Sequence, residues 1–152
     1  MRVGLVIMVV VLVIWGVLQR HRPAGGAQVA PPSIAQLLSS ETQLNLAYAS
    51  GNTRVTWSFF DHATRSALRY ERYAEDRRAC PLTPVTAETI SATSEGRGWW
   101  AVVYRESGVS LVDYWHVARG RWVFSLLRSN PRDAVLYRLS PAAYAKAVGC
   151  VG

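Results

Sequence analysis

Three segments in the second half of the chain decide the fold, and their sequences are WWAVVYR (99–105), VSLVDYWHVA (109–118) and RWVFSLL (121–127). Each segment is rich in aromatic and β-branched residues, which favour β-strands. Ser107-Gly108 and Arg119-Gly120 separate the segments, and short connections that end in glycine are typical of tight hairpin turns. The pattern therefore predicts a three-stranded antiparallel meander whose last strand places Trp122, Phe124 and Leu126 on one face.

The domain that contains this meander is expected to begin with helix. Ser33 can cap a helix, and residues 33–50 would form one or two short helices that end at Ser50-Gly51-Asn52. A break near Ser39-Ser40 is expected, because only then do the apolar residues form one stripe: Ile34, Leu37, Leu38, Leu44 and Ala47.

The next part of the chain allows two interpretations. Apolar and polar residues alternate over 54–59, which predicts a half-buried strand, and residues 66–73 could return as the second strand of a hairpin. The same stretch is rich in helix formers, and residues 72–76 have the i,i+4 spacing of a helix. We expect the hairpin, followed over residues 80–98 by a long connection with at most one irregular strand.

Two helices are expected after the meander. Asn130-Pro131 and Ser140-Pro141 each place a capping residue before a proline at the first helical position, and Gly149 would end the second helix. Together the elements predict an α+β domain, in which an antiparallel meander of about four or five strands is packed by one or two helices.

The first residues have the pattern of a single transmembrane helix. Residues 3–18 contain no charged side chain and, as a helix, would be about 24 Å long, which is short for a bilayer core of about 30 Å. Arg2 and Arg20 can extend the span by snorkelling. We expect an uncleaved anchor, because the charged residues 20–22 separate the apolar run from small residues that a signal peptidase could recognise. A cleaved signal peptide is the alternative.

The chain is thus expected to contain an anchor with its flanks (1–22), a flexible Pro/Gly linker (23–32) and a folded domain (33–152). Cys80 and Cys150 lie far apart and lack metal-binding spacing, which predicts one disulfide in an exported domain. Two free thiols in a cytosolic domain are the alternative. We expect a single-pass membrane protein with its C-terminal domain outside the cytoplasm, in the periplasm or at the cell exterior.

The basic charge does not indicate nucleic acid. The net charge of +7 comes from 17 Lys and Arg against 10 Asp and Glu, and three of the cations flank the apolar run. The other cations are interleaved with acidic residues, which is typical of a solvated surface. One basic and aromatic stretch is a candidate interface for envelope proteins or anionic lipid headgroups, and its members are Arg69, Tyr70, Arg72 and Tyr73.

Aromatic residues are a further sign of an interaction surface. The chain has six Trp, seven Tyr and three Phe, more than a small sheet with one helical layer is expected to bury. Trp99 and Trp100 are adjacent on one predicted strand, so both cannot face the core. One of these two tryptophans is therefore a candidate exposed anchor of an interface.

Asp113 is an unusual residue within a predicted strand. It shares a face with Leu111, Trp115 and Val117, and a buried carboxylate on that face needs a partner. The candidates for a buried ion pair with Asp113 are Arg105 and Arg121. Alternatively, the opposite face with Val112, Tyr114 and His116 is the core, and Asp113 is solvated.

Catalytic and metal chemistry has little support in the sequence. The domain's two histidines, His62 and His116, lie near Asp61 and Asp113, which are residue types of general acid–base pairs. On a regular strand, however, Asp113 and His116 point to opposite faces, and Asp61-His62 is typical of a turn. The sequence shows no clustered metal ligands, phosphate-binding loop or nucleophile motif, so we expect no cofactor and no enzyme activity.

The leading hypothesis is a non-enzymatic envelope protein that acts by protein–protein contact, as an accessory or assembly subunit of a membrane complex. The order of anchor, tether and small domain resembles that of accessory subunits of bacterial envelope machines. A ligand- or lipid-binding module with an aromatic pocket is the alternative. A small hydrolase that uses His62 or His116 is the third hypothesis.

Overall fold

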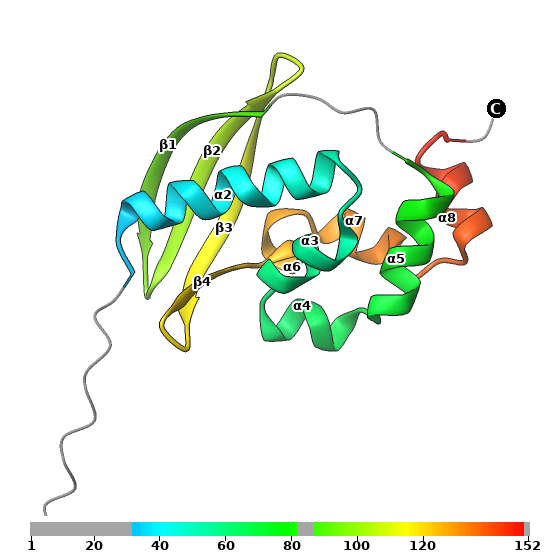
Figure 1. Cartoon of the computed structure of the whole chain (residues 1–152), viewed down its shortest axis with the longest axis horizontal. Helices are drawn as coiled ribbons and strands as arrows, with labels where there is room; N and C mark the ends of the chain where they lie inside the picture. Colours follow the sequence, from blue (N-terminus) through cyan, green and yellow to red (C-terminus); the bar gives the residue numbers. More distant parts are fainter. Residues whose placement is uncertain (1–31, 82–86, 151–152) are drawn as a thin grey trace, which may run out of the picture. The chain divides into compact units, whose positions relative to one another are not determined.

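The computed structural model describes residues 32–81 and 87–150, which form an α+β domain with a four-stranded antiparallel sheet and several helices (Figure 1). In chain order the elements are α2 (Ile34–Ala49), α3 (Thr53–Phe59), α4 (His62–Ala67), α5 (Tyr70–Ala79), β1 (Ala87–Gly96), β2 (Trp99–Glu106), β3 (Val109–Ala118), β4 (Arg121–Phe124), α6 (Leu126–Ser129), α7 (Pro131–Leu136) and α8 (Pro141–Ala147).

The sheet confirms the predicted meander. Its strand order is β1-β2-β3-β4, so every strand pairs with its neighbour in the sequence. Arg97, Ser107 and Arg119 have φ values of 51°, 50° and 52°, and each is followed by a glycine that also has positive φ. Two such residues in a row form the turn whose twist matches that of a hairpin. The strand before the predicted three, β1, lies in the region expected to be a long connection. It is irregular, because its register against β2 shifts twice.

Helix α2 is continuous, and the break expected near Ser39-Ser40 is wrong. The side chain of Ser33 accepts a hydrogen bond from the backbone of Gln36 and begins the helix. The buried positions of the helix are Leu37, Glu41, Leu44 and Ala47. Their spacing is helical throughout, and the stripe looked interrupted because one of its members is a carboxylic acid.

The hairpin expected over residues 54–73 is also wrong, since this stretch forms α3, α4 and the start of α5. Two side chains start the first two of these helices. Asn52 accepts a hydrogen bond from the backbone N–H of Val55, and Asp61 accepts one from that of Thr64 at 2.7 Å. These caps satisfy N–H groups that a helix end leaves free, and they override the short apolar alternation.

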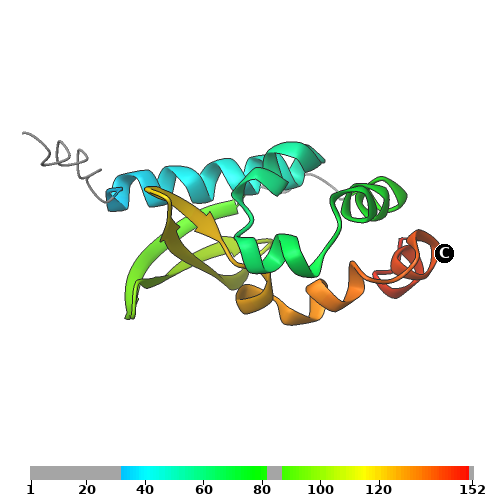
Figure 2. The same ribbon diagram turned by 90° about the horizontal axis from the view of Figure 1, so that it is seen from below.

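Helix α2 lies along one face of the sheet, as the two views in Figures 1 and 2 show. Two tryptophan side chains connect them. Trp115 Nε1 on β3 donates a hydrogen bond of 2.6 Å to Glu41, and Trp122 Nε1 on β4 donates one of 3.0 Å to the carbonyl of Ser33. Trp115 is completely buried in the hydrophobic core. The first two turns of α2 are therefore fixed to the sheet at both ends.

The C-terminal helices begin as predicted. Asn130 and Ser140 cap α7 and α8, with Pro131 and Pro141 at the first helical positions. β4 is shorter than expected, because α6 begins at Leu126 and the predicted strand extended to residue 127. After α8 the chain turns at Gly149, which has a φ of 78°.

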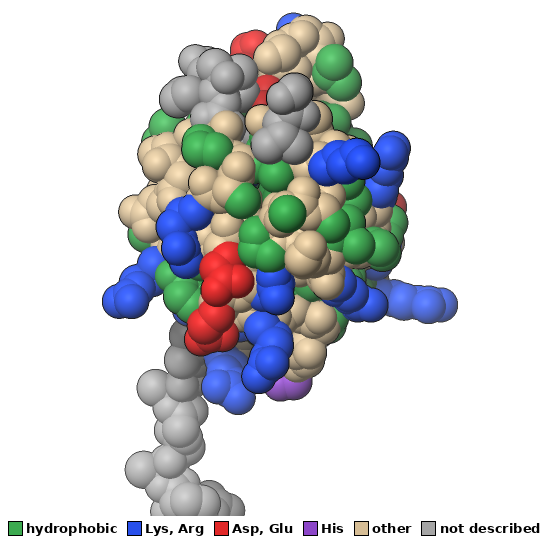
Figure 3. Space-filling model, turned by 90° about the vertical axis from the view of Figure 1, so that its right-hand side faces the viewer, with side chains coloured by type: hydrophobic (Ala, Val, Ile, Leu, Met, Phe, Trp, Pro, Cys, Tyr) green, Lys and Arg blue, Asp and Glu red, His purple; other side chains and the backbone are tan. Residues whose placement is uncertain are grey.

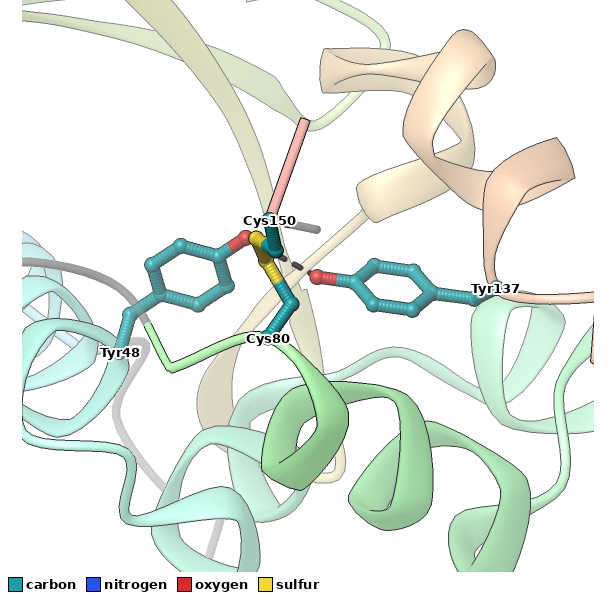
Figure 4. The surroundings of a disulfide bond; sticks show 4 residues. All are labelled: Tyr48, Cys80, Tyr137 and Cys150. Carbon is teal, nitrogen blue, oxygen red and sulfur yellow. Dashed lines mark hydrogen bonds between the residues drawn. A yellow bond between two sulfur atoms is a disulfide. The ribbon is translucent and has the colours of Figure 1, made fainter. Parts of the chain in front are cut away.

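A disulfide joins Cys80, at the end of α5, to Cys150, which follows α8, with a Cα–Cα distance of 5.5 Å (Figure 4). The predicted pairing is confirmed. Because structural disulfides persist in oxidising compartments, the bridge indicates a domain that lies outside the cytoplasm.

The predicted anchor and the linker up to residue 31 lie outside the described residues. Within residues 32–81 and 87–150, no helix has the length and hydropathy needed to cross a bilayer.

Reduction of the disulfide is expected to lower the free energy of unfolding by roughly 3–5 kcal/mol, because the bridge closes a long loop in the unfolded chain. Urea unfolding of the purified protein, with and without reductant, measures this change. The double variant C80A/C150A is the matched control and should not respond to reductant. Alkylation of both cysteines in freshly isolated, unreduced protein would show that the bridge is absent in the cell.

Candidate functional site

A pocket of about 240 Å³ opens between the C-terminal half of α2, the first half of β3 and helices α6 and α7. Its lining combines aromatic and aliphatic side chains with nearly as many polar ones. The aromatic residues that line it are Tyr48, Phe60, Tyr104, Phe124 and Tyr137. Pockets that combine apolar walls with polar groups are typical of small-molecule sites, so we take this pocket as the candidate site.

Two of these tyrosines are held in a fixed arrangement. The hydroxyls of Tyr48 and Tyr137 lie 2.9 Å apart and share a hydrogen bond, as Figure 4 shows beside the disulfide. The guanidinium of Arg77 lies 4.0 Å from the centre of the Tyr48 ring and donates a 2.7 Å hydrogen bond to the Tyr48 carbonyl. Burial raises the pKa of both tyrosines, so their hydroxyls stay protonated and neutral.

A pair of carboxyl groups forms the polar part of the site. Asp113, on β3, lines the pocket and is only 8% exposed, and its carboxyl hydrogen-bonds that of Glu41 on α2, which is fully buried. Glu41 also accepts hydrogen bonds from Trp115 Nε1 at 2.6 Å and from Asn45 Nδ2 at 2.7 Å. Glu41 is thus held by two donors, and the hydrogen bond to Asp113 needs a proton that one of the carboxyls supplies.

The protonation of this pair follows from its burial. Desolvation raises the pKa of Asp113 well above its ordinary value, and the neighbouring Glu41 raises it further. Desolvation also raises the pKa of Glu41, although the hydrogen bonds from Trp115 and Asn45 oppose this shift. Two buried carboxyls in contact cannot both ionise readily, so the pair retains a proton near neutral pH.

The remaining charged residues of the pocket are also acidic. Glu106 and Asp133 line it together with Asp113, whereas no lysine or arginine is found among the described residues that line it. Burial raises the pKa of Asp133 as well. The lining of the pocket therefore combines aromatic rings with acidic side chains.

The structure places the predicted ion-pair residues apart. Asp113 and Trp115 are buried, so their face of β3 is the core face at the centre of the strand. Arg105 lies opposite Ser110, and Arg121 lies opposite Ala118, and both arginines are exposed. Among the described residues, the ion pairs within 4.0 Å involve neither arginine nor Asp113. The buried partner of Asp113 is Glu41.

Trp99 and Trp100 lie on opposite faces of β2. Trp100 packs against the core and contacts Trp122 edge to face, with ring centroids 6.1 Å apart. Trp99 packs on His116 at 4.5 Å between centroids and also contacts the guanidinium of Arg128 at 4.6 Å. Both tryptophans are half-buried, and Trp99 is the one outside the core.

The basic and aromatic stretch around α5 does not form one surface. Tyr73 is completely buried in the core, and Tyr70 is half-buried. Arg69 is exposed, and Arg72 pairs with Glu75 at 3.7 Å. Figure 3 shows the side of the molecule that carries α5 and α8, where basic side chains are exposed with acidic ones between them.

The fold brings one histidine and one aspartate together in a combination that the sequence order did not suggest. His116 Nε2 lies 3.5 Å from Asp61 Oδ2. Asp61 uses its other oxygen to cap α4, and the imidazole is packed against Trp99. The histidine with a hydroxyl partner among the described residues is His62, whose Nδ1 lies 3.4 Å from Ser66 Oγ.

Sequence reasoning missed Glu41 and therefore the pocket. The spacing of Glu41 from Leu37 and Leu44 could have identified it as a buried acid, because these three residues share one face of a helix. In the described part of the chain, no three His, Cys, Asp or Glu side chains gather closely enough to hold a metal ion.

Stability is expected to fall as the pH rises through the range in which Glu41 loses its proton. The pKa of Glu41 is raised from 4.5 in the unfolded chain to about 7 in the folded protein. Between these values the folded state holds a proton that the unfolded state has released, so the stabilisation is complete below the lower value and lost above the upper one. Urea unfolding should give a free energy about 2–3 kcal/mol lower at about pH 8 than at about pH 5.

The control for this prediction is the double variant E41Q/D113N, which keeps the shape of the pair but has no titrating carboxyl. Its free energy of unfolding should change much less over the same pH range. A wild-type stability that stays level or increases with pH would contradict the protonated pair.

Comparison of the chain with models of protein families, with curated proteins and with solved structures finds no match. The features that bear on function are therefore those of the site itself, namely the pocket, its aromatic walls and the Glu41–Asp113 pair.

Proposed function

We propose that this domain is a non-enzymatic binding module that holds a small molecule in the pocket beside Asp113. The observation that carries the proposal is a carboxyl that is more than nine-tenths buried, lines a pocket and has another acid as its neighbour. Such a pair costs folding free energy, and groups kept at such a cost are common at ligand sites. The volume of about 240 Å³ is small and fits a ligand of modest size.

The proposal places the module at a membrane surface outside the cytoplasm. The apolar run 3–18 supports attachment by a single helix, and the disulfide supports an oxidising compartment. A tethered domain at that surface would sample ligands in the periplasm or the external medium, and the tether would keep it close to other membrane proteins.

Protein–protein contact, as an accessory subunit of a membrane complex, is a second candidate function. The observation in its favour is a set of exposed apolar side chains on β1 and β3, namely Ile90, Val109, Leu111, Val112 and Val117. Crosslinking followed by pull-down from detergent-solubilised membranes should recover a stoichiometric partner if this function applies.

Two substitutions on β3 test the pocket. Leu111 shares the face of β3 with Asp113, lines the pocket and is 38% exposed, whereas Val117 on the same face is 39% exposed and does not line it. L111W should fill the pocket and weaken ligand binding by about tenfold or more, while V117W places the same side chain away from the pocket and should bind like wild type. Thermal shifts of the full-length protein with a panel of small amines, alcohols and carboxylic acids measure binding.

A panel in which some compounds raise the melting temperature of wild type and V117W, but not of L111W, supports the binding module. The proposal fails if no compound stabilises the wild type at millimolar concentration. It also fails if L111W responds to the panel as strongly as V117W does.

A further inference from the structure

We infer that the pocket takes a small organic cation, an ammonium ion with apolar substituents, and that Asp113 provides its counter-charge. The inference rests on the proposed binding function and specifies the class of ligand. Three features of the site support it. The charged residues that line the pocket are acidic, its walls contain aromatic rings, and Asp113 has no basic partner among the described residues.

The charges favour a cation. Asp113, Glu106 and Asp133 all line the pocket, and Glu41 adds a further carboxyl behind Asp113. No arginine or lysine is among the described lining residues that could receive an anion. A carboxylate or phosphate ligand would therefore meet like charge from several directions, whereas a cation would be attracted.

Asp113 has no basic side chain as an ion-pair partner among the described residues. Within the described part of the chain, the ion pairs are Arg72–Glu75 and His116–Asp61, so neither involves this carboxyl. The carboxyl beside it, that of Glu41, already accepts hydrogen bonds from Trp115 and Asn45, and Glu106 adds a further acid nearby. A bound cation would place an opposite charge at the carboxyl that faces the pocket, and its binding would release the proton that the Glu41–Asp113 pair retains in the free protein.

The walls favour an organic cation over an inorganic one. Tyr104, Tyr137, Phe60 and Phe124 line the pocket together with Tyr48, one face of which is covered by Arg77. The faces of aromatic rings attract ammonium groups and also accept their alkyl substituents, an arrangement suited to amines and quaternary ammonium ions. The described residues bring no three metal-ligating side chains together, so the oxygen cage that a divalent metal needs is not formed.

A set of three isosteric probes tests the sign of the charge. Choline is the cation, tert-butylethanol is its uncharged carbon isostere, and the tert-butylacetate anion has a similar shape with a negative charge. Isothermal titration calorimetry on the full chain, purified in an uncharged maltoside detergent, gives the affinities. Choline should bind at least about tenfold more tightly than tert-butylethanol, and the tert-butylacetate anion should bind most weakly.

Substitutions then test the assignment to Asp113. D113N keeps the shape of the side chain and should weaken choline binding by about tenfold, with little change for tert-butylethanol. E88Q removes one acid from the exposed side of β1 and is the matched control, which should bind choline like wild type. E106Q removes a half-buried carboxyl at the pocket and gives a second, milder test if D113N does not fold.

The source of the cation is tested with glycerophosphocholine, the phosphatidylcholine headgroup without its acyl chains, in the same calorimetric titration. Binding of glycerophosphocholine that is lost in D113N would identify the cation as a lipid headgroup, and binding of choline alone would identify it as a free solute. Either result agrees with the inference.

The inference and the proposed function fail in different ways. Equal affinities of choline and tert-butylethanol, both lost in L111W, would overturn the cation and leave the binding pocket intact. Unchanged choline binding in D113N or in L111W would also overturn the inference, because the cation would then bind elsewhere. If choline does not bind at millimolar concentration, the inference is wrong, and the broader compound panel decides whether the pocket binds anything.

Discussion

The hydrogen bond from Trp115 to Glu41 determines how the main helix lies on the sheet. Trp115 is the largest completely buried side chain, and its indole N–H needs an acceptor in a region that water does not reach. The acceptor is a carboxyl 74 residues earlier in the chain, at the centre of α2. Asp113 lies two residues before Trp115 on the same face of β3, so the contact that satisfies the indole also brings two acids together. The pocket and its charge are thus direct consequences of one buried donor.

The helical part of the domain is fixed to this arrangement by aromatic and covalent links. Tyr137, which follows α7, contacts Tyr73 on α5 and stacks on Tyr144 of α8, with ring centroids 5.0 Å and 5.2 Å apart. Its hydroxyl then reaches Tyr48 at the end of α2. The disulfide lies beside this contact and joins α5 to the segment after α8. One wall of the pocket is therefore rigid because three helices and a covalent bond converge on it.

Local patterns in the sequence predicted local structure well. The glycines that end the turns specify the meander, because few other residues adopt positive φ at low cost, and the Asn-Pro and Ser-Pro pairs specify where α7 and α8 begin. The interpretation of residues 54–73 was wrong because the alternation over six residues was weaker evidence than the caps at Asn52 and Asp61. The site could not be predicted, since a polar residue within an apolar stripe looks like a break until its partner on a distant strand is known.

The two sulfur atoms of the disulfide have different surroundings, because Cys80 is completely buried and Cys150 is exposed. Thiol–disulfide exchange requires an attacking thiolate to reach one sulfur, so an external thiol or an oxidoreductase would form its mixed disulfide at Cys150. Cys80 would then leave as a thiol enclosed by the core, beside the Tyr48–Tyr137 contact. The redox state of the bridge is therefore accessible from one side only, while the effects of its opening would be felt at the wall of the pocket.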